Sequence, residues 1–313
     1  MAELHEIRTL LQQTTAALSE LQADIAQFPN EPGLLVNANS LQKRQRELEE
    51  DFLAAARTQG EAVCSYRLFT DTRPTISALS KALLDFQSVF SLIYSAIRRG
   101  PRARAVLGAE LTRETSFNFG YTFAGSVGVV FTLPAQERSD EEQNLLDRTI
   151  ETVFGLAKAQ NPEQVAEFAR ELGRPPIKAT YTWAKDHAFY GLGASVKWYR
   201  GPAASGELSV QRPELERLRD IIALSTEETT EEITVYGLLE AADIRRRTFR
   251  ILADDGTDIR GHFDQAISEA HTVVLPRRYV AVLRKRSRVI LATDQEDITY
   301  HLLRLDLPGL FSR

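Results

Sequence analysis

Cysteine is almost absent from the sequence, and histidine is sparse. The 313 residues include one cysteine, Cys64, and five histidines. A single thiol excludes an intramolecular disulfide and a zinc site made of several cysteines, and it suits a reducing compartment. The histidines form neither an HExxH motif nor a pair at helical spacing beside a carboxylate, so we predict no metal site and no cofactor. Cys64 lies in an apolar, strand-like run and is predicted to be a core residue.

The short motifs of nucleotide binding and of nucleophilic catalysis are also missing. The chain contains no GxxxxGK[ST], no GxGxxG and no GxSxG. Gly191 and Gly193 supply half of the second motif, but they follow a predicted helix, whereas that motif must follow a strand. The acidic run 254–258 lacks the glycine and glutamate spacing of an EF-hand, and it predicts a hairpin turn instead. An enzyme without a recognisable motif is therefore only the third hypothesis.

Long apolar runs are absent as well. The first 13 residues, MAELHEIRTLLQQ, mix acids and glutamines with leucines, unlike a signal peptide. A membrane span needs about 20 consecutive apolar residues, and the apolar segment 86–97 is interrupted by Gln87, Ser88 and Ser91. These absences predict a cytoplasmic protein with no membrane partner. The net charge of -5 and the pI of about 5.7 argue against a surface that is basic all round, as in many nucleic-acid-binding domains.

Two stretches with heptad spacing precede residue 60. Apolar residues recur three and four apart on both sides of a break at 29–33, so residues 1–60 are predicted to form an antiparallel coiled-coil hairpin. Two such arms display more apolar surface than one seam buries, which predicts association with a protein partner or with a second copy. The residues expected to mediate association are Leu4, Ile7, Leu11, Leu18, Leu21, Ile25, Leu41, Leu48 and Phe52.

Residues 61–200 are predicted to form an α+β domain. A strand at 61–69 precedes a broad-faced amphipathic helix at 76–97. Alternating aromatic residues and a Gly-Ser turn predict a β-hairpin at 115–133. Three capped helices and a strand at 192–198 follow. This order predicts a sheet of at least three strands with helices on one face.

The aromatic residues of this domain have two interpretations. Phe117, Phe119, Tyr121 and Phe123 alternate along the predicted hairpin, so they either belong to the core or line a pocket, and we expect the core. Tyr181, Trp183, Tyr190 and Trp198 are expected to complete that core. His187 follows Asp186 directly, but adjacent helical side chains diverge, so we predict a helix-face histidine and no catalytic dyad.

The C-terminal third changes character. Residues 201–232 are predicted to be a linker that contains one helix, from Pro213. Strands are expected at 233–239, 248–252, 258–263, 279–285, 289–292 and 298–305, with a short helix at 264–270. Three strands, a helix and two or three strands is an order that resembles a small β-barrel, either an OB-fold or an SH3-like barrel. The resemblance predicts a ligand-binding domain at 233–313.

Two basic clusters flank strands of this predicted barrel. Residues 233–313 hold 13 Lys and Arg against 11 Asp and Glu, while the whole chain is acidic. The clusters predict weak binding of single-stranded nucleic acid through phosphates. Alternatively, the cations pair with Asp243, Asp258, Glu296 and Asp297 on neighbouring strands and leave no free positive field. The residues concerned are Arg245, Arg246, Arg247, Arg250, Arg284, Lys285, Arg286 and Arg288.

The sequence therefore predicts a multi-domain α+β protein and three ranked functions. First is a non-enzymatic adaptor or assembly subunit of a bacterial-type cytoplasmic complex that associates through its coiled-coil hairpin. Second is a nucleic-acid-binding protein that acts through the basic barrel. An enzyme ranks last.

Overall fold

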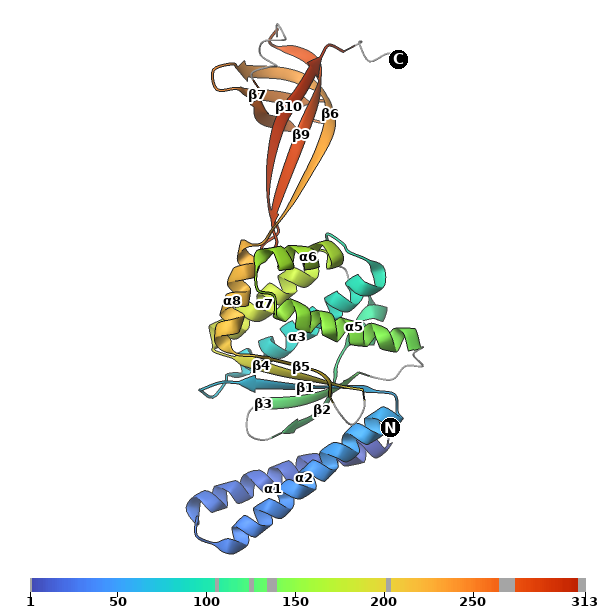
Figure 1. The fold of residues 1–313 in the computed structure, drawn as a ribbon, viewed down its shortest axis with the longest axis vertical. Helices are drawn as coiled ribbons and strands as arrows, with labels where there is room; N and C mark the ends of the chain where they lie inside the picture. The colour runs from blue at the N-terminus through green and yellow to red at the C-terminus, as the bar shows by residue number, and fades with distance from the viewer. Residues whose placement is uncertain are drawn as a thin grey trace. The chain divides into compact units, whose positions relative to one another are not determined.

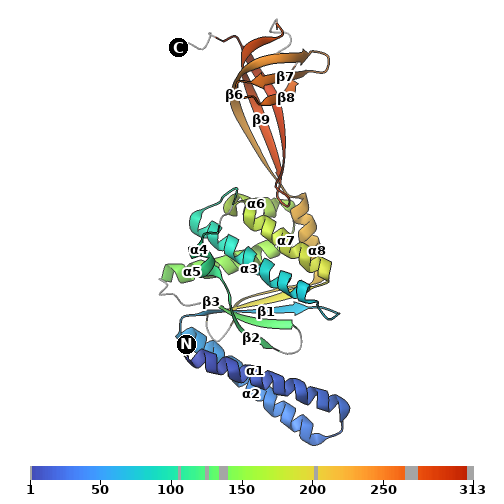
Figure 2. The same ribbon diagram turned by 180° about the vertical axis from the view of Figure 1, so that it is seen from behind.

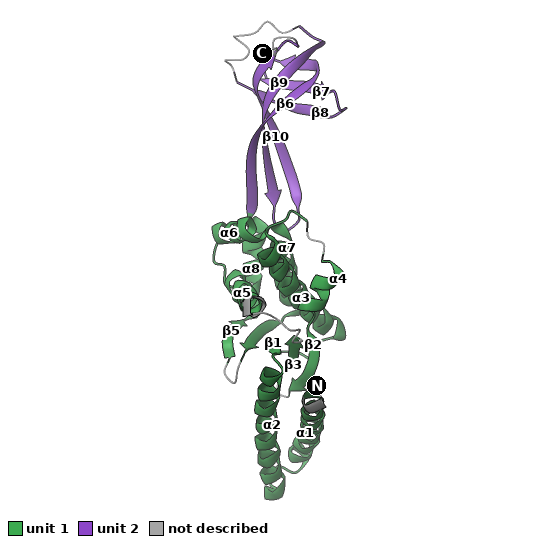
Figure 3. Ribbon diagram, turned by 90° about the vertical axis from the view of Figure 1, so that its right-hand side faces the viewer, with its two compact units in different colours: residues 1–225 green, residues 226–313 purple. Residues whose placement is uncertain are grey.

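A computed structural model of the chain describes residues 2–104, 107–123, 127–133, 140–200, 204–264 and 274–308. The chain divides into unit 1, residues 1–225, and unit 2, residues 226–313 (Figure 3). Both units contain one five-stranded sheet, and helices are described in unit 1, so the mixed α+β class is confirmed. The structure differs from the predicted division at 60 and 200, because the hairpin and the helix of the predicted linker belong to unit 1.

Unit 1 begins with the predicted helical hairpin. Helix α1 (Ala2–Gln27) and helix α2 (Pro32–Thr58) run side by side and antiparallel (Figure 1). Pro32 lies in the first turn of α2, where its fixed φ and missing N–H do not disturb the helix. Leu11, Leu18 and Leu48 are buried, as the heptad spacing predicts for seam positions.

The sheet of unit 1 contains five antiparallel strands in the order β2-β3-β1-β4-β5. The strands are β1 (Ala62–Phe69), β2 (Asn118–Phe123), β3 (Val127–Leu133), β4 (Gly193–Tyr199) and β5 (Ala204–Val210). The predicted linker at 201–232 is therefore wrong. It contains β5, whose Leu208 and Val210 are buried while Glu207 and Ser209 are exposed, the alternation of an edge strand with one covered face.

Helices cover one face of this sheet, and the hairpin covers the other (Figures 1 and 2). The helices on the first side are α3 (Ile76–Arg99), α4 (Ala109–Thr115), α5 (Asp140–Ala157), α6 (Pro162–Leu172), α7 (Arg174–Tyr190) and α8 (Arg212–Leu224). On the opposite face, Leu11, Leu48 and Phe52 of the hairpin pack against Val63, Tyr121 and Val130 of the strands. The apolar surface of the hairpin that its own seam does not bury thus packs against the sheet of unit 1.

Helix α3 is long and apolar enough, by length and composition alone, to cross a membrane. In the structure it packs against α7 and α5, and Phe86, Phe90, Ile93 and Tyr94 are buried. Helix α3 therefore has the position of a core helix, which is consistent with a soluble protein.

Unit 2 is built from five strands whose pairing closes on itself. They are β6 (Thr226–Asp243), β7 (Thr248–Ala253), β8 (Asp258–Phe263), β9 (Arg277–Ile290) and β10 (Gln295–Asp306). The order is β10-β8-β7-β6-β9, and β9 pairs with β10 to complete the ring. Neighbours are antiparallel except for β8 and β10, which are parallel. The hairpin turn predicted at 254–258 is confirmed.

Two sequence predictions in unit 2 need correction. Residues 226–232 are part of β6 because they pair with 284–290 of β9. The predicted break between 285 and 289 is absent: β9 runs unbroken to Ile290, and the turn comes at 291–294. Except for Asp264, the helix predicted at 264–270 lies outside the described residues.

Candidate functional site

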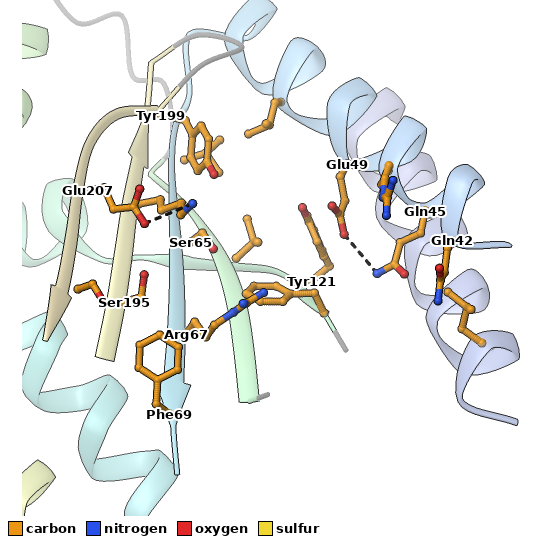
Figure 4. A pocket seen from close by; sticks show the side chains of 18 of the residues that line it. Gln42, Gln45, Glu49, Ser65, Arg67, Phe69, Tyr121, Ser195, Tyr199 and Glu207 are labelled. Carbon is orange, nitrogen blue, oxygen red and sulfur yellow. Dashed lines mark hydrogen bonds and ion pairs between the residues drawn. The ribbon is translucent and has the colours of Figure 1, made fainter. Parts of the chain in front are cut away.

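A cleft of about 680 Å³ lies between the hairpin and the sheet of unit 1 (Figure 4). Residues from α1, α2 and all five strands line it. In Figure 4 Glu49 and Gln45 point from the helix toward the strands, and Tyr121 and Arg67 lie opposite them. The cleft is large enough for a small organic ligand, since ligand pockets commonly measure about 300 to 1,000 Å³.

The strand register arranges the floor of the cleft in two rows. Side chains of directly paired residues stand beside one another on the same face. The aromatic and apolar members lie on β2 and β3, and the polar members lie on β1, β4 and β5. The first row is Phe123, Gly128, Arg67, Ser195 and Ser209, and the second is Tyr121, Val130, Ser65, Lys197 and Glu207.

Gly128 shapes the aromatic end of the first row. A Cβ atom at this position would lie 2.1 Å from the ring of Phe123, so only glycine leaves room for that ring over β3. The guanidinium of Arg67 lies 4.9 Å from the centroid of the same ring, within cation–π range. The small residue on β3 therefore places Phe123 beside Arg67.

The helical wall brings a carboxylate and a second arginine to the cleft. Gln45 Nε2 donates a hydrogen bond to Glu49 Oε1 at 3.2 Å. Burial raises the pKa of Glu49, while the Gln45 hydrogen bond and the charges of Arg46 and Arg67 act to lower it. Arg46 on α2 and Arg67 on β1, which belong to opposite walls of the cleft, thus both favour the charged form of this carboxylate.

The charges of the cleft are only partly compensated. Lys197 Nζ pairs with Glu207 Oε1 at 3.3 Å. Neither Arg46 nor Arg67 has an ion-pair partner among the described residues. With Glu49 and Glu207 as the carboxylates in the lining, three cations face two anions, so the cleft favours an anionic guest.

The aromatic row predicted from the sequence is split between the two faces of the sheet. The register of β2 shifts between Phe119 and Tyr121, which places Tyr121 and Phe123 in the cleft and leaves Phe119 50% exposed. The core prediction holds for Tyr121, which is buried between the hairpin and the sheet, and for Phe117, which packs against Phe86 and Phe90 of α3. It is wrong for Phe119, and the pocket alternative holds for Phe123, which lines the cleft. Gly120 was the available signal, because a glycine inside a strand pattern often marks a bulge.

The other face of the sheet holds a closed polar network. Trp183 Nε1 donates to the hydroxyl of Tyr66 at 3.0 Å, and that hydroxyl lies 2.9 Å from His187 Nε2. His187 Nδ1 lies 2.8 Å from the carbonyl of Trp183, so a neutral imidazole satisfies every partner. His187 is fully buried rather than on an exposed helix face, and burial lowers its pKa to about 4. Cys64 is buried as predicted, and burial raises the pKa of its thiol.

The association residues predicted in the hairpin lie within unit 1. Leu11, Leu18, Leu48 and Phe52 are buried, and Leu4, Ile7, Leu21, Ile25 and Leu41 are half-buried. Apolar exposure in the hairpin is concentrated instead at its tip, which comprises the turn and the start of α2. There Phe28 is 58%, Leu35 46% and Val36 62% exposed. The heptad spacing extends to Phe28, three residues after Ile25, but it did not identify Leu35 and Val36 at the start of α2.

Most of the predicted basic residues of unit 2 pair with carboxylates. Across the β6–β9 ladder, Arg284 pairs with Glu232 at 3.4 Å and Lys285 with Glu231 at 2.8 Å. Glu228 accepts from Arg286 at 2.6 Å and lies 3.7 Å from Arg288.

A second group lies around β7. Arg250 pairs with Asp258 at 2.9 Å and with Glu240 at 3.2 Å. Arg246 lies 3.9 Å from Asp243. The turn 244–247, which contains Arg245 and Arg247, follows β6.

Unit 2 begins at residue 226, whereas the predicted barrel began at 233, so the numbers of basic and acidic residues in this domain differ from those of the prediction. Starting unit 2 at residue 226 adds Glu227, Glu228, Glu231 and Glu232, so 13 Lys and Arg face 15 Asp and Glu. A depression of about 510 Å³ is lined by β6, β7, β8 and β10, and it includes Arg250, Arg260 and Tyr300. Both of these arginines are bonded to Asp258, whose pKa falls to about 2 in consequence.

Within the described ranges, no group of three or more His, Cys, Asp or Glu side chains is placed to hold a metal ion. No family model, curated protein or solved structure matches the chain, so its function has to be inferred from the geometry of these sites.

Proposed function

We propose that the protein is a non-enzymatic adaptor or assembly subunit that associates through the tip of its helical hairpin. The observation that carries the proposal is the exposure of Phe28, Leu35 and Val36 at the tip of the hairpin. The seam and the base of the hairpin are already buried in unit 1, so these side chains have no intramolecular role that explains their type. Clustered exposed apolar side chains are typical of interaction sites.

The favoured partner is a second copy of the chain. The half of α1 near the tip carries exposed Glu20 and Asp24, and the corresponding half of α2 carries exposed Lys43 and Arg44. Two hairpins that overlap antiparallel at their tips would set the acidic tip half of α1 in one against the basic tip half of α2 in the other, as in a four-helix bundle. There Lys43 and Arg44, which pair with Glu47 within their own helix, can exchange that partner for Glu20 and Asp24. A stable interface buries about 800 Å² per partner, so these helix faces must take part together with the three tip residues.

The mass of the full chain in solution tests this proposal. We expect light scattering after gel filtration to give twice the chain mass of 35.1 kDa, and Phe28→Ser with Val36→Asp to return it to the mass of one chain. Phe189→Ser is the matched control, because Phe189 on α7 is 78% exposed but lies away from the hairpin. A wild-type protein that stays monomeric at high concentration, or a dimer unaffected by the tip substitutions, would refute self-association.

The second candidate is nucleic-acid binding by unit 2. The parallel pairing of the third and fifth strands supports an OB-like arrangement, a Greek-key barrel, over an SH3-like one. The depression on β7 and β8 lies where OB-folds commonly bind oligonucleotides. The paired cations and the acidic balance of the unit oppose this function, because phosphate contacts need free positive charge.

Fluorescence anisotropy with labelled single-stranded DNA and RNA at low salt separates the two candidates. If the protein is an assembly subunit, we expect no binding of either nucleic acid that depends on Arg284 and Arg286. The double variant Arg284→Glu with Arg286→Glu should then give the same anisotropy as the wild type. A salt-sensitive affinity that this double variant removes would favour the second candidate.

A further inference from the structure

The cleft of unit 1 has a chemical gradient that the assembly function does not use. Its floor changes from Tyr121 and Phe123 at the β2 side to serine hydroxyls on β1, β4 and β5. Two arginines without ion-pair partners among the described residues stand on opposite walls. From this arrangement we infer that the cleft binds a small phosphate-bearing ligand with an attached planar ring, of the size of a nucleotide.

The phosphate end of the ligand is assigned to Arg46 and Arg67. Guanidinium groups bind phosphate through charge-assisted, often bidentate hydrogen bonds. Ser195 and Ser209 stand in the same row as Arg67, so their hydroxyl groups are available to donate to the remaining oxygens. Because Arg46 is on α2 and Arg67 is on β1, a phosphate that contacts both would join the helical wall to the sheet.

The ring end is assigned to the aromatic side of the cleft. The Phe123 ring lies over the glycine of β3, and the Arg67 guanidinium lies over that ring, so this pair marks the place where the planar end of the ligand meets its phosphate end. The phenol of Tyr121 stays neutral because burial raises its pKa, so it adds no negative charge near the phosphate. Leu18 and Leu53 cover the apolar part from the hairpin.

Isothermal titration of the full chain with three probes tests the inference. ADP carries both features, inorganic pyrophosphate lacks the ring, and adenosine lacks the phosphates. We expect ADP to bind more tightly than pyrophosphate and adenosine to bind least. Arg46→Gln and Arg67→Gln should each weaken ADP binding by about 10-fold or more, the loss expected for one charge-assisted contact. Arg57→Gln is the matched control, since Arg57 is exposed on the same helix but lies outside the cleft and at the end of α2 far from the tip.

Three results would overturn the inference. One is the absence of heat for ADP and pyrophosphate at millimolar concentration. Another is an ADP affinity that stays unchanged in both Arg46→Gln and Arg67→Gln, when circular dichroism shows that both variants are folded. The third is tighter binding of a ring-bearing carboxylate, 4-hydroxybenzoate, than of ADP, which would replace phosphate by carboxylate as the ligand. None of these readouts depends on whether the hairpin tip dimerises, because the tip substitutions lie outside the cleft.

Discussion

The two faces of the unit 1 sheet are made by alternate residues of the same strands, yet they differ in chemistry. On β1, Cys64, Tyr66 and Leu68 point to the helical face and are almost fully buried. Their neighbours Ser65 and Arg67 point to the hairpin and line the cleft. Successive side chains of a strand point to opposite faces of the sheet, so one strand can present apolar residues to the helices and polar residues to the cleft. The helical face is filled by core side chains, and the hairpin covers the other face only in part, which leaves the cleft.

The difference arises from what covers each face. Five helices longer than ten residues form the layer on the helical side, where Trp183, Phe86 and Phe90 from helices and Trp198 from β4 are buried. The hairpin touches the other side mainly around Phe52 and Tyr121, whose rings meet edge to face at 5.0 Å. Beyond that contact the helices stand away from β4 and β5, and polar side chains occupy the space (Figure 4).

The largest expected contrast is between two adjacent residues of β4. Trp198 on the helical face is 1% exposed, and Lys197 lies in the cleft. Trp198→Ala should lower the free energy of unfolding by about 3 to 5 kcal/mol. Lys197→Ala should change it by less than about 1 kcal/mol, because an ion pair this exposed contributes little. Urea denaturation of both variants checks the contrast, and equal losses would mean that the faces are not distinct.

Removing one hydroxyl group tests the closed polar network. Tyr66→Phe leaves Trp183 Nε1 and His187 Nε2 buried without their partner, which should cost about 1 to 3 kcal/mol of unfolding free energy. Tyr199→Phe is the matched change on the cleft side, where the residue is half-buried, and should cost about 0.5 kcal/mol or less. If the two phenylalanine variants unfold at the same urea concentration, the network contributes no stability.

The pH dependence of stability should reveal two opposing groups on the helical face. His187 has a pKa of about 4, below its ordinary 6.5, so its stabilisation is lost as the pH falls from 6.5 to 4. Burial, with the nearby Asp186 charge, raises the pKa of Asp85 from 3.8 to about 6, so Asp85 favours the folded state increasingly as the pH falls through 6.

Asp85→Asn should therefore make the protein lose stability more steeply between pH 6.5 and 4 than the wild type does. The full His187 contribution is roughly 3 kcal/mol. Thermal unfolding of wild type and Asp85→Asn across this pH range measures the difference in slope. Asp71→Asn, which removes an exposed carboxylate, is the control. Parallel pH profiles of wild type and Asp85→Asn would show that Asp85 has no such role.

The smallest expected effect concerns the carboxylate in the cleft. Glu49→Gln removes a charge that opposes an anionic ligand, so ADP affinity should increase by about 2- to 5-fold. Glu47→Gln lies two residues away on the outer side of α2 and should leave the affinity unchanged. Weaker ADP binding in Glu49→Gln would mean that this carboxylate contacts the ligand directly.

Sequence periodicity predicted the helices well because their signals are local. The three-four spacing gave the hairpin and α3, and the predicted caps of α6 are present, with Asn161 accepting from the Gln164 N–H at 2.9 Å. The start of β6 was missed because its glutamates give no apolar alternation, and the basic residues that pair with them lie more than 50 residues away at 284–288. Such pairing is invisible to a local pattern.

The cleft was missed for a related reason. Its lining extends from Leu18 to Ser209, and no two of its charged groups form a motif. Ser65 and Arg67 on the predicted first strand were one available sign, because a strand covered on both faces would be apolar throughout. Gly120 and Gly128 were the other, since each marks a close approach to a neighbouring strand or ring.

The most direct test of the division between the two faces measures stability and binding in one variant. The unfolding temperature of wild-type protein and of Arg67→Gln is recorded without ligand and with a large excess of ADP. We predict equal temperatures without ligand, a rise with ADP for the wild type, and little or no rise for Arg67→Gln, because ligand binding stabilises only the state that binds it. An unfolding temperature of Arg67→Gln far below that of the wild type without ligand, or a rise with ADP as large as that of the wild type, would contradict this account.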